Sequence, residues 1–218
     1  MNIYRSTNNH KELLVIFAGF AGHFSHFVPF VPKTLDWICI SDYRCLDLES
    51  LKEVFELFAC YKKISIIAFS MGVWVANKAI VEWGVEESQI TQKIAVNGTE
   101  FGIDKQYGIP PKLFALTLKR FDLKAFLQNL FLGEIPKDYV FLQEKELKEE
   151  LKSLLNHQSS PQKNLIWDKV IISKNDLIFS SQNQIRFWSD FYPHKTQIIS
   201  LDAPHFAFFH LQDLFRGL

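Results

Sequence analysis

A serine stands between an apolar run and a helix-forming run in the stretch SIIAFSMGVWVANKAI, residues 65–80. A nucleophilic serine on a sharp strand-to-helix turn typically has the pattern G-x-S-x-G. Here Ala68, Ser70 and Gly72 occupy its three fixed positions. The flanking residues must be small because the turn crowds its neighbours, and alanine meets that need. The segment predicts a nucleophile at Ser70, and a serine that merely caps the next helix is the alternative.

A histidine and an acid that could serve this serine follow later, in the order Ser…Asp…His that accompanies such a turn. His205 follows the last apolar run, and Asp176 follows the run before it. The histidine would take the serine proton, and the acid would fix the imidazole tautomer. We therefore expect a catalytic triad of Ser70, Asp176 and His205. Other histidines and acids near these runs are less well placed: His194, His210, Asp168 and Asp202.

A glycine-containing turn follows the first strong apolar run, in VIFAGFAGH at residues 15–23. With a nucleophile on this type of turn, one oxyanion N–H comes from such a loop and the other from the residue after the serine. Here those backbone amides belong to Phe20 and Met71. Loss of one such donor typically costs about 10²–10³ in rate. A plain strand-end turn is the alternative, because neither phosphate-binding glycine pattern is present.

Two histidines in H-x-x-H spacing, His23 and His26, continue from this turn. They have no obvious further ligands at a confirming spacing, so we predict no metal site. We expect them to line the mouth of a pocket.

Short, nearly continuous apolar runs alternate with segments of helical length. Such runs are typical of strands buried on both faces of a parallel sheet, and they occupy residues 13–18, 37–41, 64–69, 93–97, 169–173 and 196–201. Helices are expected between them at residues 48–60, 71–83 and 182–191. The alternation predicts an α/β fold with a mostly parallel central sheet flanked by helices.

No strand is expected between about residues 104 and 160. Helices are predicted there at residues 111–119, 123–130 and 143–155, the last with Glu and Lys at helical spacing. We interpret residues 104–160 as a helical cap inserted in a single domain of residues 1–218.

The composition excludes some partners. Basic and acidic side chains number 24 each, so no overall charge favours nucleic acid or a membrane surface. No apolar run reaches the ~18 residues of a membrane span, and the first residues lack the order of a signal peptide. Cys39, Cys45 and Cys60 predict free, mostly buried thiols in a reducing compartment. We expect a cytoplasmic protein whose 21 phenylalanines line a core or a pocket.

Five stretches spread over nearly the whole chain share one resemblance: FAGFAG, AFSMGVWVA, VNGT, GIPPKLFALTLKRF and PHFAFF. Together they resemble the BioG-type pimeloyl-[acyl-carrier protein] methyl ester esterases of biotin synthesis, in the α/β-hydrolase superfamily. The alanine variant of the serine turn, with its flanking MGVWVA, is the most specific part. Phe20 departs from the tryptophan expected in related sequences, which keeps the backbone amide but alters the local pocket shape.

The resemblance implies an α/β-hydrolase fold and a reaction. The methyl ester of pimeloyl-[acyl-carrier protein] would be hydrolysed to pimeloyl-[acyl-carrier protein] and methanol without a cofactor. Ser70 would be the nucleophile, His205 its base and Asp176 the orienting acid. The residues by themselves favour only a serine hydrolase. An acyl thioesterase, a short-chain carboxylesterase and a non-catalytic carrier-binding module remain alternatives.

The first half of the predicted cap is basic. From residue 105 to residue 133, five cations stand against the single acid Asp122: Lys105, Lys112, Lys119, Arg120 and Lys124. Residues 134–152, by contrast, carry six acids and four lysines. An acidic acyl carrier protein could dock on the first half, with Lys112, Lys119 and Arg120 as the expected contacts. A solvated helix face is the alternative.

The same half of the cap also carries phenylalanines. Phe114, Phe121 and Phe126 are expected on its apolar underside, against the acyl chain or the core. We expect the protein to act as a monomer.

Overall fold

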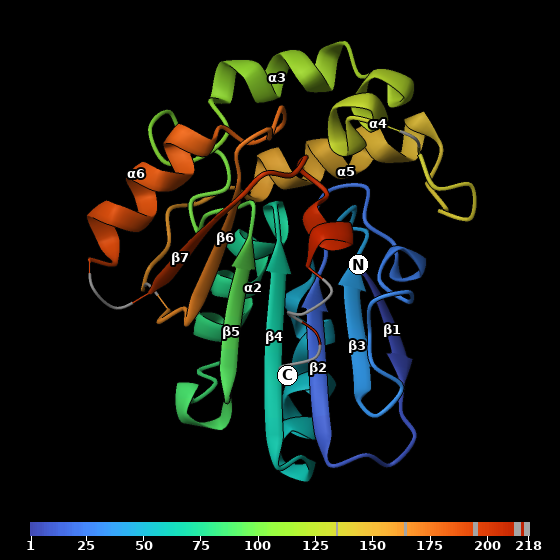
Figure 1. The fold of residues 1–218 in the computed structure, drawn as a ribbon, viewed down its shortest axis with the longest axis vertical. Coiled ribbons are helices and arrows are strands. Elements are labelled where there is room, and N and C mark those ends of the chain that lie inside the picture. Colours follow the sequence, from blue (N-terminus) through green and yellow to red (C-terminus); the bar gives the residue numbers. More distant parts are fainter. Residues whose placement is uncertain (134, 164, 194–195, 212–214, 216–218) are drawn as a thin grey trace.

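The computed structural model describes residues 1–133, 135–163, 165–193, 196–211 and 215. Within them, one seven-stranded sheet has the order β1-β3-β2-β4-β5-β6-β7 (Figure 1). Edge strand β1 (Asn2–Ser6) is antiparallel to β3 (Asp36–Ser41). The remaining neighbours pair in parallel, and these strands are β2 (Glu12–Phe17), β4 (Lys63–Phe69), β5 (Gln92–Val96), β6 (Lys169–Ser173) and β7 (Gln197–Leu201).

The strands predicted from apolar runs are all present, although the expected burial on both faces is wrong for edge strand β7, in which no residue is fully buried. Strand β1 is an addition. Its sequence NIYRS has no apolar run, because it lies at a sheet edge and none of its residues is fully buried. An edge strand needs less apolar surface than a central one, so its pattern is weaker.

Helices α2 (Met71–Glu82) and α6 (Ser181–Phe191) occupy two predicted helical segments. The continuous helix predicted for residues 48–60 is wrong. A 3-10 turn at Leu48–Leu51, a short α1 (Lys52–Glu56) and another 3-10 turn at Leu57–Cys60 take its place. Buried Leu48, Leu51 and Val54 are spaced by three residues, which fits the tighter winding of a 3-10 turn.

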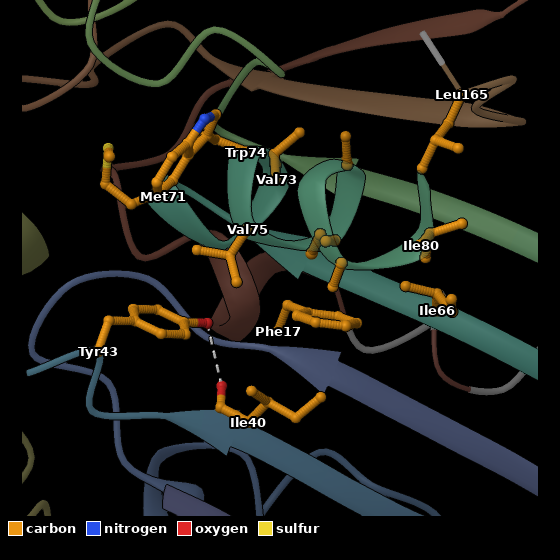
Figure 2. Packing of buried hydrophobic residues seen from close by; sticks show 14 of the residues in the cluster. Phe17, Ile40, Tyr43, Ile66, Met71, Val73, Trp74, Val75, Ile80 and Leu165 are labelled. Carbon is orange, nitrogen blue, oxygen red and sulfur yellow. Dashed lines mark hydrogen bonds between the residues drawn. The ribbon is translucent and has the colours of Figure 1, made fainter. Parts of the chain in front are cut away.

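The two faces of the sheet are covered differently. One face packs against α2, where Val75 and Ile80 face Phe17 and Ile66 of the strands (Figure 2). Phe187 and Trp188 of α6 join the same cluster. The other face is covered by one end of α4 (Leu123–Phe131) and by aromatic side chains from other segments: Phe27, Phe206, Phe208 and Phe215.

Helices α3 (Pro111–Lys119), α4 and α5 (Glu144–His157) lie over the carboxyl ends of the strands (Figure 1). They match the helices predicted in the insertion. Pro111 begins α3 at a position that suits its missing N–H, and Asp122 caps α4 by accepting from the Ala125 N–H at 2.7 Å. Helix α5 buries leucines in the cluster that also contains α2, so it is packed onto the sheet layer.

The three cysteines are free, as predicted, but the expected burial is wrong for two of them. Cys39 is buried in β3, whereas Cys45 and Cys60 are exposed beside turns. In the described part of the chain, no helix has the length and apolar character that crossing a bilayer requires.

Candidate active site

Ser70 occupies a strained turn between β4 and α2. Its φ is 55° and its ψ is −125°, a conformation that costs about 1–3 kcal/mol for a residue with a side chain. Its N–H donates to the Val96 carbonyl at 2.8 Å, which anchors the turn to β5. Its side chain makes no hydrogen bond that caps α2. The geometry therefore does not support the helix-cap interpretation.

Small residues permit the close approaches around this turn. A Cβ on Gly19 would lie 2.8 Å from the Ser70 Cβ, and one on Gly72 would lie 2.2 Å from the Phe17 carbonyl oxygen. Gly98 is restricted in the same way, because its Cβ would lie 2.3 Å from the Ser70 carbonyl oxygen. The ends of β2 and β5 thus lie against the Ser70 turn because Gly19, Gly72 and Gly98 have no side chains.

Ser70, His205 and Asp176 form one chain of hydrogen bonds. The His205 Nε2 lies 2.9 Å from the Ser70 Oγ, and its Nδ1 lies 2.7 Å from the Asp176 Oδ2. The side chains of His205 and Asp176 are 2% and 0% exposed. Because an ionised carboxylate only accepts, Nδ1 carries the imidazole proton and Nε2 accepts from the serine hydroxyl. This is the arrangement of a nucleophile, its base and an orienting acid.

The other acids and histidines weighed from the sequence lie elsewhere. Asp168 accepts from the Lys93 N–H at 2.7 Å, at the opposite end of β6. Asp202 is exposed and accepts from the Asn175 side chain. His210 is exposed on a 3-10 turn, and His194 lies outside the described residues.

Asn97, which the sequence analysis did not single out, holds the backbone of His205. Its Nδ2 donates to the His205 carbonyl at 2.6 Å and to the Ser173 Oγ at 2.8 Å, while its Oδ1 accepts from the Ser173 N–H. Its φ of 49° is unusual outside glycine. A polar residue followed by glycine at the end of a buried strand, as in VNGT, was the available clue.

Asp176 is likewise held by neighbours that the sequence analysis missed. Its Oδ1 accepts from the N–H groups of Ile178 and Phe179 at 2.8 and 2.7 Å. Its Oδ2 also accepts from the Gln184 side chain at 3.3 Å. Gln184 is fully buried at the start of α6, and a glutamine within an apolar helix face was the only clue.

The two amides predicted for the oxyanion hole flank Ser70. Met71 begins α2, so its N–H has no partner within the helix. Phe20 lies in a turn of residues 19–22 that is closed by a bond from the Gly22 N–H to the Gly19 carbonyl at 3.0 Å. Among the described residues, neither amide donates a hydrogen bond within the chain. Both are therefore available to a bound oxyanion.

Ser70 and His205 open onto a cavity of about 350 Å³ between the sheet and the cap. The cap side is mostly apolar and includes the predicted Phe114 and Phe121, with Phe126 beside them. Arg120 also lines the cavity. Lys112 and Lys119 are instead exposed on α3. Of the three residues predicted to contact the carrier protein, Arg120 thus lines the cavity, whereas Lys112 and Lys119 lie on the outer surface.

The expectation that His23 and His26 line the pocket mouth is wrong. His26 is buried, and burial lowers its pKa to about 4, so the ring is neutral. Its Nε2–H donates to the Val140 carbonyl at 2.7 Å, and the His23 side chain caps the 3-10 turn that contains His26. This pair connects the loop after β2 to the chain leading into α5.

The sheet order, the strained serine turn and the helices over the strand ends define an α/β-hydrolase fold. A carboxylesterase of Nitrososphaera gargenis superposes with a TM-score of 0.65 at 10% identity, covering 99% of this chain and 92% of that one. The RedJ thioesterase of Streptomyces coelicolor superposes with a TM-score of 0.61 at 13% identity, covering 96% and 91%. At such identities the likeness concerns the fold.

The chain belongs to the BioG family, because the family model for pimeloyl-ACP methyl esterase BioG matches residues 1–214. The crystal structure of BioG from Haemophilus influenzae superposes with a TM-score of 0.78 at 24% identity, covering 96% of each chain. An uncharacterized protein of Haemophilus influenzae is 27% identical over 215 residues, which are 91% of this chain and 90% of that protein.

A malonyl-[acyl-carrier protein] O-methyltransferase of Bacteroides fragilis is also similar to this chain. The two are 34% identical over 194 residues, which are 83% of this chain but only 37% of that longer protein.

Proposed function

We propose that this protein hydrolyses the methyl ester of pimeloyl-[acyl-carrier protein], giving pimeloyl-[acyl-carrier protein] and methanol in biotin biosynthesis. One observation carries the proposal: the hydrogen-bonded chain of Ser70, His205 and Asp176 opens onto an apolar cavity. Membership of the BioG family supports the choice of substrate. The name of the Bacteroides relative, which specifies methyl transfer to a carrier-bound acyl group, accords with methyl ester chemistry.

In the first half of the reaction, the Ser70 Oγ attacks the ester carbonyl carbon while the His205 Nε2 takes the hydroxyl proton. The N–H groups of Phe20 and Met71 donate to the oxyanion that forms. The bond from carbon to the methoxy oxygen then breaks, and His205 gives its proton to that oxygen. Methanol leaves, and the acyl chain stays on Ser70 as an ester.

In the second half, water attacks the carbonyl carbon of this ester and passes a proton to His205. The bond to the Ser70 Oγ breaks, and His205 returns the proton to the serine. The product acid ionises to a carboxylate. Asp176 keeps its charge throughout and stabilises the imidazolium that forms in both halves.

The cavity and the basic cap surface give the substrate its orientation in this proposal. Residues 104–160 act as a cap, whose Phe114 and Phe121 contact the acyl chain. The exposed Lys112 and Lys119 attract the acidic carrier protein, and Arg120 meets the substrate at the cavity wall. The protein acts as a monomer in the cytoplasm.

The test is methanol release from methyl pimeloyl-carrier protein, with the mass of the carrier-bound acyl group followed in parallel. We expect loss of the methyl group with the thioester intact. Ser70→Ala and His205→Ala should reduce activity to near background with the fold retained. Ser88→Ala, at an exposed serine away from the cavity, is the matched control and should leave activity unchanged. A fluorophosphonate should label the wild-type protein but not Ser70→Ala.

Two results would replace the proposal. Cleavage of the thioester alone would identify an acyl thioesterase. If Ser70→Ala is silent in every assay and no fluorophosphonate labelling occurs, the chain is a carrier-binding module without catalysis.

A further inference from the structure

A carboxyl group is buried where the cap meets the sheet. Glu150 lies on α5 among the buried Leu147, Leu151 and Leu154 and is 0% exposed. Its Oε2 accepts from the Ala21 N–H at 3.2 Å, and its Oε1 accepts from the Tyr43 N–H at 3.1 Å. Among the described residues, no Lys, Arg or His forms an ion pair with it. A buried carboxylate without a cation is costly, so the two amides are its main compensation.

Both amides belong to strained turns at the carboxyl ends of neighbouring strands. Ala21 has a φ of 60°, and Asp42, which precedes Tyr43, has a φ of 55°. Residues with a Cβ seldom adopt such values and need surrounding contacts to hold them. One carboxylate therefore stabilises the unfavourable turns after β2 and β3 together.

Ala21 is the third residue of the turn that presents the Phe20 amide. The turn of residues 19–22 is hydrogen-bonded, with φ positive at Ala21 and not at Phe20, which makes it type II. Rotation of the peptide between these two residues would convert it to type I. That rotation would turn the Phe20 carbonyl oxygen toward the carboxylate in place of the Ala21 N–H. Glu150 therefore favours the type II form of the turn. The Phe20 N–H lies in the preceding peptide, so Glu150 acts on it by holding the whole turn of residues 19–22 in place.

Tyr43 contacts the strand end that leads into the same turn. Its hydroxyl lies 2.8 Å from the Ala18 carbonyl oxygen and 3.2 Å from that of Ile40 (Figure 2). Ala18 directly precedes Gly19, the first residue of the turn. The carboxylate of Glu150 thus contacts the turn directly at Ala21 and, through Tyr43, the strand end that leads into it.

We propose that Glu150 is a positioning residue, which fixes the backbone of Phe20 so that its N–H donates to the oxyanion at Ser70. The inference rests on the proposed function, since it needs an ester reacting at Ser70. It also makes cap helix α5 part of the support of the active site.

Glu150→Gln tests the inference with little change in volume. The amide side chain keeps one acceptor oxygen but places an NH₂ group against the other backbone N–H. Hydrolysis of p-nitrophenyl acetate at Ser70 is the assay, because it does not depend on the pimeloyl substrate. We expect kcat to fall about 10–100-fold, part of the effect of losing an oxyanion donor, with KM within about twofold. Glu149→Gln, at the exposed neighbour on the same helix, should match wild type.

A second substitution separates positioning from a general structural effect. Glycine adopts positive φ without strain, so Ala21→Gly added to Glu150→Gln should recover part of the lost kcat. Circular dichroism and thermal unfolding establish that each variant is folded at the assay temperature. If Glu150→Gln does not fold, Glu150→Asp, which keeps a carboxylate on a shorter side chain, is judged by the same criteria.

The outcomes distinguish the inference from the proposed function. A folded Glu150 variant with wild-type kcat overturns the inference and leaves the proposed function standing. Absence of any hydrolysis that depends on Ser70 in the wild-type protein overturns the proposed function, and the inference with it.

Discussion

At the scale of single residues, Asp176 combines two tasks. Its Oδ2 bonds to the His205 Nδ1 at 2.7 Å, and its Oδ1 accepts two backbone N–H groups from the turn that follows. The two bonds from backbone N–H groups hold the carboxylate in place independently of its bond to His205. The direction of the imidazole therefore depends on the turn that leads into α6.

Asp176→Asn should lower kcat about 10³–10⁴-fold with little change in stability. The amide can donate to the imidazole Nδ1 and so favour the wrong tautomer. Steady-state hydrolysis by folded protein measures the effect. Asp202→Asn, at the exposed acid nearest in sequence to His205, should stay within about twofold of wild type. If the two variants are equally active, another acid orients the histidine.

Glu150 also makes stability depend on pH. Burial raises the pKa of Glu150 from 4.5 to about 7. The hydrogen bonds from the Tyr43 and Ala21 amides lower this pKa and so oppose the effect of burial. The charge of Asp42 raises the pKa, and the charge of Arg44 lowers it. Between pH 4.5 and about 7, Glu150 binds more protons in the folded state than in the unfolded state. The free energy of unfolding therefore falls as pH rises to about 7, and this contribution is constant above it.

The difference between 4.5 and about 7 corresponds to about 3 kcal/mol. Urea unfolding of wild type and Glu150→Gln across this range should show the wild type losing stability relative to the variant by roughly that amount. A stability difference independent of pH would show that the carboxyl group keeps an ordinary pKa in the folded protein.

Local sequence patterns predicted only part of the site. Ser70 and the glycine-containing turn that presents Phe20 were predicted because their roles depend on neighbours in the chain. Glu150 and Asn97 were missed because their partners are about a hundred residues away. The one clue to Glu150 was its place in the stripe with Leu147, Leu151 and Leu154, since an acid on a buried helix face needs a partner.

At the scale of elements, α2 lies against β2 so closely that Gly72 has no room for a side chain. Gly72→Ala should lower the free energy of unfolding by about 1–3 kcal/mol or more, because the new methyl group meets backbone oxygens that cannot move aside. Urea denaturation measures this. Gly133→Ala, where the nearest heavy atom is 3.8 Å from the added Cβ, is the control and should be close to neutral. Equal effects would argue against tight packing at Gly72.

The elements that the sequence predicted best are those whose pattern of burial is regular along the chain. Strands buried on both faces have continuous apolar runs, and the helices of residues 111–157 show clear amphipathic spacing. Strand β1 and the turns of residues 48–60 are only partly buried, so packing against distant residues decides their conformation. A short stretch of sequence does not reveal which distant residues pack against it.

At the scale of the molecule, the charges sum to zero but are not evenly mixed. Lys112, Lys119 and Lys124 are all exposed on α3 and α4. The double variant Lys112→Glu/Lys119→Glu should raise KM for the carrier-linked substrate about 3–10-fold at low ionic strength, and less at high salt. It should not affect hydrolysis of a small free ester.

Lys62→Glu is the control for this prediction, because Lys62 is exposed beside the amino end of β4, opposite the cap. If both variants change KM equally, overall charge is responsible. If neither does, the carrier protein docks elsewhere.

The last part of the chain supplies both His205 and the aromatic side chains that cover one face of the sheet. Synthesis on the ribosome proceeds from the amino terminus, so Ser70 and its strained turn are made long before the proposed base. A nascent chain that ends before residue 205 lacks this proposed proton acceptor and leaves apolar strand surface open to solvent. Under the proposed mechanism, the protein becomes active only when the segment around His205 packs over the sheet, and the appearance of activity during translation would time that packing step.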